Sequence, residues 1–391
     1  FEQRKRRAKS STATPPRSAR PPTKTVAKIG SLMSRFERKA NYAVVGVGLA
    51  GRGMGWFHAL QLVNGDVAGA KLTDVVEPFF LGEVGKKTGG GEAFAKDVVE
   101  VWEPEGVKFH ASLENLWEDC EGPKIALIAG RTVDNPSLFR AALKAGATHI
   151  LLEKPGAPTV AELEAMATEA KAKGVPVFMG FIKNIAAYFE DALEVAEGNK
   201  CTLISRNDYT KENLAECFAR NSEGLLKNMA IHELALAAQF FGMRADNVTN
   251  VELEPDNCEC LTLEGRTDFS KIDFTLTNED GKCVRIYADR CAGDGCCAKV
   301  HDPAGKEIFS KELVDAASVE RVKARSLEHP DWLSYLITQE PEYADLKSRC
   351  AKAALAGDFP PAVATIDIAI AALKLAEYLT PVLQAKLTTQ K

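Results

Sequence analysis

Lys154 is the residue whose surroundings in the sequence are best suited to catalysis. It lies in Glu153-Lys154-Pro155, directly after the apolar run Ile150-Leu151-Leu152. If that run is a strand of an open α/β sheet, Lys154 lies beyond its carboxyl end, where such sheets bind ligands. Pro155 favours an extended backbone for Lys154. We therefore expect Lys154 to reach a substrate oxygen and, together with Glu153, a bound cofactor. A surface lysine before a turn is the alternative.

Asn228 and His232 form a second candidate pair. They are four residues apart, so they share one face if the segment is helical. A histidine can take up or release a proton near neutral pH. We expect both side chains to address the ligand of Lys154, although such a pair can also be structural. Lys183-Asn184 follows the last predicted strand of the first half, and Lys183 is a weaker candidate for a substrate contact.

A glycine motif indicates the cofactor. Residues 46–51 read Gly-Val-Gly-Leu-Ala-Gly, follow the strand-like run Tyr42–Val45 and precede a helical stretch from Gly53. In this context G-x-G-x-x-G is typical of dinucleotide binding. The first glycine makes the tight turn, the second admits the pyrophosphate, and the third allows close packing of helix and strand. The helix N-terminus adds oriented N–H groups. The predicted cofactor-binding residues of the turn are Gly46, Gly48, Leu49, Ala50, Gly51 and Arg52.

Glu77 favours NAD over NADP. It ends the second predicted strand, twenty-six residues after Gly51. An acidic side chain there accepts hydrogen bonds from ribose hydroxyls and repels a 2′-phosphate. Arg52 could still serve a phosphate, so NADP remains the alternative.

The elements that would position these residues alternate in the first half. Strand-like runs lie at 42–45, 71–77, 125–129, 150–152 and 175–179, and Pro176 suggests an early or edge position for the last one. The clearest helix spans 160–173, with Thr159 and Glu162 as a capping box and Gly174 as its stop. The pattern predicts a doubly wound, mostly parallel Rossmann sheet.

The second half has a different pattern. Residues 225–241 read as one amphipathic helix, and the strands 272–276 and 284–288 flank an Asn-Glu-Asp-Gly turn that indicates a hairpin. A final helix carries Ile366, Ile370 and Leu373 on one face, and Pro381 is expected to stop it. We therefore predict an α/β fold: the Rossmann domain at 41–182, then an α/β domain at 183–391 with a large, mostly antiparallel open sheet.

Charge and composition narrow the function. Residues 1–40 carry twelve Lys and Arg against two Glu, whereas the whole chain has a net charge of −5. The acidic body argues against nucleic-acid binding, and no apolar run reaches the roughly 18 residues of a membrane span. The basic segment reads as a disordered tail or an organellar transit peptide; without the latter, a cytoplasmic location is expected. Ten irregularly spaced cysteines favour reduced thiols over a metal site, although Cys291, Cys296 and Cys297 in a predicted Gly-rich turn leave a zinc cluster open.

Together, these motifs resemble the Gfo/Idh/MocA family of glucose–fructose and inositol dehydrogenase-like oxidoreductases. The resemblance covers about residues 41–380 and rests on the glycine turn, Glu153-Lys154-Pro155, the segment with His232, and Leu355-Ala356-Gly357-Asp358-Phe359-Pro360. It implies hydride transfer to or from a sugar or cyclitol carbon, with Lys154 and His232 acting at the substrate hydroxyl. It also implies that the open sheet forms homo-oligomers.

Two departures from the family pattern leave alternatives open. The family usually has Asp where this chain has Asn228, and an amide cannot take a proton. The loop at 129–135 also differs, and its Arg131 could meet an anionic substrate or simply lie on the surface. A dinucleotide-binding regulator or scaffold without turnover therefore remains an alternative, as does a reductase of an unsaturated substrate such as a tetrapyrrole. Arg206, Asp208 and Tyr209 are expected to contribute to specificity.

Overall fold

The computed structural model describes residues 38–114, 116–117 and 120–389. The predictions about the N-terminal tail, and the compartment inferred from it, lie outside the described residues. Within this part of the chain, none of the helices combines the length and the apolar character that a membrane crossing requires.

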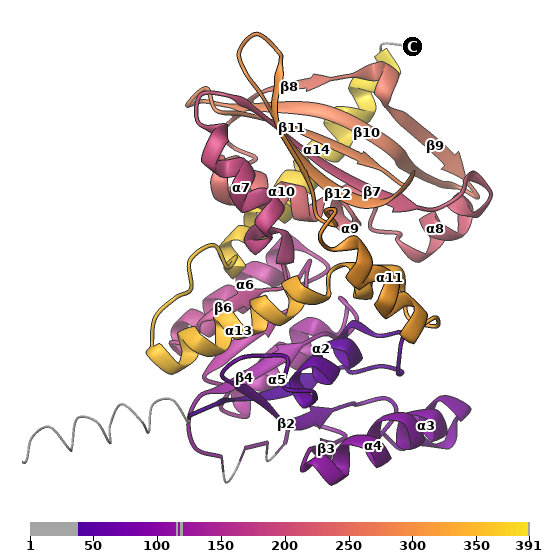
Figure 1. Cartoon of the computed structure of the whole chain (residues 1–391), viewed down its shortest axis with the longest axis vertical. Coiled ribbons are helices and arrows are strands. Elements are labelled where there is room, and N and C mark those ends of the chain that lie inside the picture. Colours follow the sequence, from indigo (N-terminus) through magenta and orange to yellow (C-terminus); the bar gives the residue numbers. More distant parts are fainter. Residues whose placement is uncertain (1–37, 115, 118–119, 390–391) are drawn as a thin grey trace, which may run out of the picture. The chain divides into compact units, whose positions relative to one another are not determined.

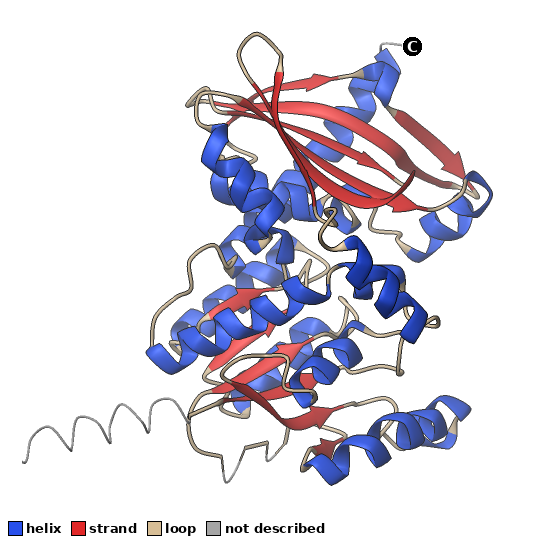
Figure 2. Ribbon diagram, viewed as in Figure 1, coloured by secondary structure: helices blue, strands red, loops and turns tan. Residues whose placement is uncertain are grey.

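The first sheet has six parallel strands in the order β3-β2-β1-β4-β5-β6 (Figures 1 and 2). All five predicted strands are present, and β6 lies at an edge, as its proline suggested. The short strand β3 was not predicted, because three residues carry little periodic signal. The strands are β1 (Ala40–Val45), β2 (Ala70–Val76), β3 (Lys108–His110), β4 (Lys124–Ile128), β5 (His149–Leu152) and β6 (Val177–Met179).

The helices of the first half follow from local sequence signals. Helix α6 begins after Thr159, whose hydroxyl accepts from the Glu162 N–H at 3.2 Å, as the predicted cap requires. The Glu162 carboxylate accepts from the Thr159 hydroxyl at 3.1 Å and not from its backbone N–H, so the second half of the predicted capping box is not formed. Leu163, Met166 and Ala170 are its buried stripe. The helices are α2 (Met54–Val63), α3 (Gly89–Phe94), α4 (Glu100–Trp102), α5 (Asn135–Lys144) and α6 (Val160–Ala172).

The second sheet has seven strands in the order β13-β12-β7-β11-β10-β8, with β9 pairing to β10. It is mostly antiparallel, and the β10–β11 hairpin is confirmed, but β7 and β11 are parallel. The cysteines expected in a Gly-rich turn lie instead in β12, whose register shifts between Cys291 and Gly295, so the glycines mark a bulge. The strands are β7 (Lys200–Asp208), β8 (Val248–Leu253), β9 (Glu259–Leu263), β10 (Arg266–Asn278), β11 (Cys283–Asp289), β12 (Cys291–His301) and β13 (Glu307–Glu312).

Helices α7, α9, α10 and α14 gather on one face of this sheet and leave the other face open (Figure 2). Helices α10 and α14 pack against each other, and α7 contacts β12 and β13. The helices are α7 (Ala187–Ala196), α8 (Leu214–Arg220), α9 (Leu225–Asn228), α10 (Ile231–Phe240), α11 (Val319–Glu328), α12 (Ser334–Thr338), α13 (Glu340–Ala356) and α14 (Ile366–Thr389).

Two predictions about where helices begin and end were wrong. The single helix predicted over 225–241 is divided into α9 and α10, because the Ala230 N–H bonds to the Leu225 carbonyl, five residues back, and closes a wider turn.

Pro381 does not stop the last helix; α14 continues through it to Thr389. An interior proline costs about 3 kcal/mol, but the buried Leu379, Leu383 and Leu387 continue the apolar face on both sides of it, and burial of each contributes about 1.5–3 kcal/mol.

Helix α13 joins the two halves of the chain. It lies in the C-terminal half of the sequence, yet it packs against β1, β2 and α2 of the first sheet (Figure 1). Its buried Tyr343, Leu346 and Cys350 belong to the apolar core of that sheet. The hydroxyl of Tyr42 in β1 donates to the backbone carbonyl of Lys347 in α13 at 2.8 Å. The segment 183–391 therefore contributes one helix to the packing of the first sheet.

Candidate active site

The glycine turn has the backbone that a dinucleotide requires. Gly46, Gly48 and Gly51 all have positive φ, between 73° and 80°, a conformation that other residues rarely adopt. A Cβ on Gly46 would lie 2.7 Å from the Gly130 Cα. The close helix–strand approach expected at Gly51 occurs instead at Gly55, where a Cβ would lie 2.1 Å from the Gly46 carbonyl oxygen. Gly51 faces a tryptophan, Trp332, whose Cδ1 would lie 3.5 Å from a Cβ there.

Glu77 lies beside this turn, directly after β2. One carboxylate oxygen accepts from the Gly48 N–H at 2.9 Å and the other from the Phe79 N–H at 3.2 Å. The side chain is buried. Each carboxylate oxygen can accept two hydrogen bonds, so both keep capacity for further donors such as ribose hydroxyls. The positive-φ glycines and the remaining acceptor capacity of Glu77 thus suit a dinucleotide.

A cavity of about 950 Å³ brings together residues from both halves of the chain. Lys154 enters it from the end of β5, and its ammonium group donates to the Asn228 carbonyl at 3.3 Å. Burial lowers the pKa of Lys154 below its ordinary value, although Glu153 opposes this shift. The predicted residues that line the cavity are Arg52, Glu153, Lys154, Lys183, Asn228 and His232.

Lys183 anchors a buried polar cluster at this cavity. Its ammonium group donates to the Ser205 hydroxyl at 3.1 Å and to the Glu233 carboxylate at 2.5 Å. Burial opposes its charge, but Cys296 and Glu233 outweigh that effect and raise the pKa of Lys183. Lys183 is therefore a fixed positive charge. The sequence analysis named Lys183 as a weaker candidate but did not identify its partners. Its partners Ser205, Glu233 and Cys296 belong to separate elements, so no local pattern connects them to Lys183.

His232 is held as a neutral base. Its Nδ1 is buried without a hydrogen-bond partner among the described residues, and the ring packs edge-on against Phe181 with centroids 5.6 Å apart. Burial, followed by the charges of Lys183 and Lys154, lowers the pKa of His232 well below its ordinary value. His232 lines the polar cavity, and a neutral imidazole there is suited to accept a proton from a ligand.

Asn228 lies in the cavity wall, but its side chain has another partner. The amide nitrogen donates to the Glu223 carboxylate at 2.8 Å. Because α9 ends at Asn228, the backbone carbonyl points to Lys154. Asn228 thus positions Lys154 through its main chain.

The cavity also contains residues that sequence motifs did not identify. Asp294 lies on the bulged part of β12, and burial, followed by the charge of Asp208, raises its pKa. Trp332, Tyr335 and Tyr343 come from the α11–α13 segment. The specificity candidates Arg206, Asp208 and Tyr209 line the cavity as well. No local pattern marks Asp294, because the long-range pairing of β7 with β12 brings it to the cavity.

Arg131 does not line this cavity. Its guanidinium group pairs with Asp134 at 2.7 Å, and 81% of its side chain is exposed.

The thiols of Cys291, Cys296 and Cys297 form no disulfide bonds with described residues. Within the described ranges, no group of three or more His, Cys, Asp or Glu side chains is arranged to hold a metal ion.

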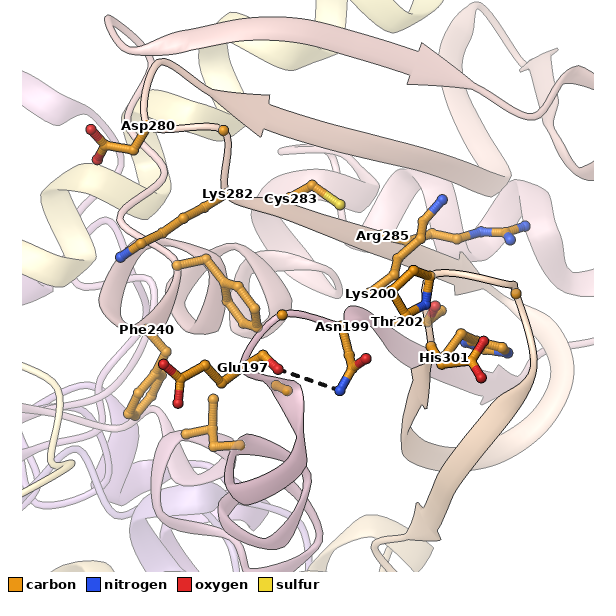
Figure 3. Close-up of a pocket in the computed structure, with 18 residues that line it drawn as sticks. Glu197, Asn199, Lys200, Thr202, Phe240, Asp280, Lys282, Cys283, Arg285 and His301 are labelled. Carbon is orange, nitrogen blue, oxygen red and sulfur yellow. Dashed lines mark hydrogen bonds between the residues drawn. The ribbon is translucent and has the colours of Figure 1, made fainter.

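A second cavity, of about 1050 Å³, lies at one end of the second sheet (Figure 3). Figure 3 shows Lys200, Arg285 and His301 on neighbouring strands, with Glu197 and Asn199 from the loop after α7. The Asn199 amide donates to the Glu197 carbonyl at 3.4 Å. None of the predicted catalytic or cofactor-binding residues is among the described residues that line it, so the chemistry belongs to the first cavity.

The first sheet and its glycine turn have the arrangement of a dinucleotide-binding Rossmann fold. Residues 40–181 match the model of the GFO_IDH_MocA family, described as an oxidoreductase family with an NAD-binding Rossmann fold. The match confirms, for this segment, the resemblance drawn from the sequence: residues 40–181 are similar to the NAD-binding Rossmann domain of that family.

Solved structures extend the similarity to most of the chain, at the level of the fold. A probable dehydrogenase from Thermotoga maritima has a TM-score of 0.64 at 18% identity, covering 90% of this chain and 97% of that one. Scyllo-inositol dehydrogenase from Lactobacillus casei, with bound NAD(H) and scyllo-inositol, has a TM-score of 0.61 at 13% identity, covering 87% and 96%. Myo-inositol 2-dehydrogenase from Lactobacillus plantarum has 0.61 at 17%, covering 90% and 98%. No curated protein sequence matches the chain.

Proposed function

We propose that this protein is an NAD-dependent dehydrogenase that moves a hydride between nicotinamide and a carbon-bound hydroxyl or carbonyl of a sugar, a cyclitol or a related small molecule. The observation that carries the proposal is the cavity that Lys154, Lys183 and His232 line together. The bound scyllo-inositol of the Lactobacillus casei structure supports the substrate class.

The chain's own groups supply the acid–base part of this reaction. When bound, the dinucleotide accepts or returns the hydride. Neutral His232 takes the hydroxyl proton on its imidazole ring and returns it in the reverse direction. Lys154 polarises the same oxygen, and the Asn228 carbonyl directs its ammonium group. Lys183 adds a fixed positive charge that stabilises a developing alkoxide. Because these groups are largely buried, the effective dielectric constant around them is low, and their electrostatic interactions with the substrate oxygen are stronger than in water.

A fluorescence titration of residues 41–391 with NADH and NADPH, followed by a panel of sugars and cyclitols, tests the proposal. Saturable NADH binding with turnover of a polyol would support it. Saturable binding with no turnover would favour the regulator or scaffold. If only an unsaturated substrate is reduced, the protein is instead the reductase named above as an alternative. If neither NADH nor NADPH binds, the proposed oxidoreductase function is refuted.

Glu77→Gln should weaken the preference for NADH over NADPH by about tenfold or more. The amide oxygen can still accept from the Gly48 N–H, but the charge that repels a 2′-phosphate is lost, and a tenfold change corresponds to about 1.4 kcal/mol. The ratio of the two dissociation constants measures this effect. Glu83→Gln, in the exposed loop after β2, is the matched control. An unchanged ratio would show that Glu77 does not select the cofactor.

We also propose that the open face of the second sheet pairs two copies of the chain. Ile204, Tyr287 and Cys297 are neighbours in register on β7, β11 and β12, and Ile204 lies outside the apolar core. In sedimentation experiments, Ile204→Arg should convert an oligomer into a smaller species, because it places a charge in the contact. A monomeric wild-type protein would refute this proposal.

A further inference from the structure

We propose that Lys347 is a positioning residue for Lys154 and acts on it through His58 and Glu153. This inference rests on the proposed function, because it assigns how the proposed catalytic lysine is held. Lys347 belongs to α13, far from the motif residues in sequence, and the mechanism above does not use it.

Lys347 is connected to the cavity through His58 and Glu153. Its ammonium group donates to the Gln61 side-chain oxygen at 2.7 Å and lies 3.0 Å from the His58 Nδ1. The opposite ring nitrogen, Nε2, lies 3.0 Å from one carboxylate oxygen of Glu153. Burial, followed by the charge of Lys347, lowers the pKa of His58 to about 4, so the ring is neutral. Its single proton therefore belongs on Nε2, where it can be donated to Glu153.

Burial makes the charge balance of Glu153, His58 and Lys347 energetically important. His58 and Lys347 are fully buried, and Glu153 is 8% exposed. A buried carboxylate without a compensating charge is costly and tends to take up a proton. Lys347 supplies that charge through the imidazole bridge. Burial lowers the pKa of Lys347 to about 7, so its ammonium form predominates below neutral pH.

The Glu153 carboxylate in turn fixes the backbone that carries Lys154. Its second oxygen accepts from the Lys154 N–H at 3.3 Å. The carboxylate is also wedged against Gly180, where a Cβ would lie 2.6 Å from its Oε1. Lys154 then reaches the Asn228 carbonyl across the cavity. A shift of Glu153 therefore moves the base of the Lys154 side chain, and displacements of about 1 Å can cost 10²-fold in rate.

The test compares Lys347→Met with Lys352→Met in the full chain at pH 6. Lys352 is an exposed residue of the same helix and serves as the matched control. We expect Lys347→Met to lower kcat at least tenfold while KM and the NADH dissociation constant stay within threefold, because the glycine turn is unaffected. Lys352→Met should change none of these. If Lys347→Met fails to fold, the double variant Lys347→Met with Glu153→Gln removes both buried charges and should fold with the same loss of kcat.

Two structural readouts separate this proposal from the proposed function. Nitrogen NMR should place the wild-type His58 proton on Nε2, and a crystal structure of Lys347→Met should show Lys154 displaced. A proton on Nδ1, an unmoved Lys154, or a kcat within threefold of wild type would overturn the positioning role. Absence of turnover in the wild-type protein would instead refute the proposed function, and the crystal structure would still decide the role of Lys347.

Discussion

His232→Ala is expected to lower kcat/KM for alcohol oxidation by about 10²–10⁴-fold, the contribution of a positioned general base. Its Nδ1 has no partner among the described residues, and other side chains at the cavity, Lys154 and Lys183, are held as cations or directed elsewhere. Steady-state kinetics across the substrate panel measure the loss. A decrease of less than tenfold would contradict the assignment of His232.

The pH dependence provides an independent check on His232. Its pKa lies well below the ordinary value, and the base is active only when unprotonated. The oxidation rate should therefore stay level as pH falls through 6.5, the usual histidine value, and decline only at more acidic pH. His301→Ala, at the other cavity, should leave the rate within about threefold. A decline centred near 6.5 would mean that the ring is not desolvated as the structure indicates.

Lys154→Met should lower kcat by about 10²–10³-fold, which is the typical effect of removing one donor that stabilises developing charge on oxygen. Methionine has a similar length and removes a buried charge, so the variant should fold. We therefore expect a loss of rate without a loss of thermal stability.

The control for Lys154 is Lys144→Met, at the exposed end of α5, which should behave as wild type. Circular dichroism and the NADH dissociation constant establish that both variants are intact. If Lys154→Met retained more than a tenth of the wild-type kcat, the ammonium group would not act at the reacting oxygen. A large increase in KM with an unchanged kcat would instead assign Lys154 to substrate binding alone.

Local signals in the sequence were sufficient for the first domain. The strand before Gly46, the glycine turn and the cap that Thr159 provides for α6 each depend on neighbouring residues, so periodicity and turn chemistry predicted them correctly. The residues near strand ends, Glu77 and Lys154, were also identified, because parallel strands place their carboxyl ends at one edge.

Tertiary packing decided the rest. Burial of three leucines outweighed the missing N–H of Pro381, and one wide turn divided the helix predicted to carry Asn228 and His232. The pairing of β7 with β12 brought Asp294 and Cys296 to the cavity.

The packing of α13 places Lys347 beside His58, although 289 residues separate them in the sequence. These contacts depend on long-range burial and on strand order, which no window of neighbouring residues contains. The sequence by itself therefore determined the kind of cofactor domain and the main candidates for catalysis, whereas only the tertiary structure decided how their charges are balanced and held.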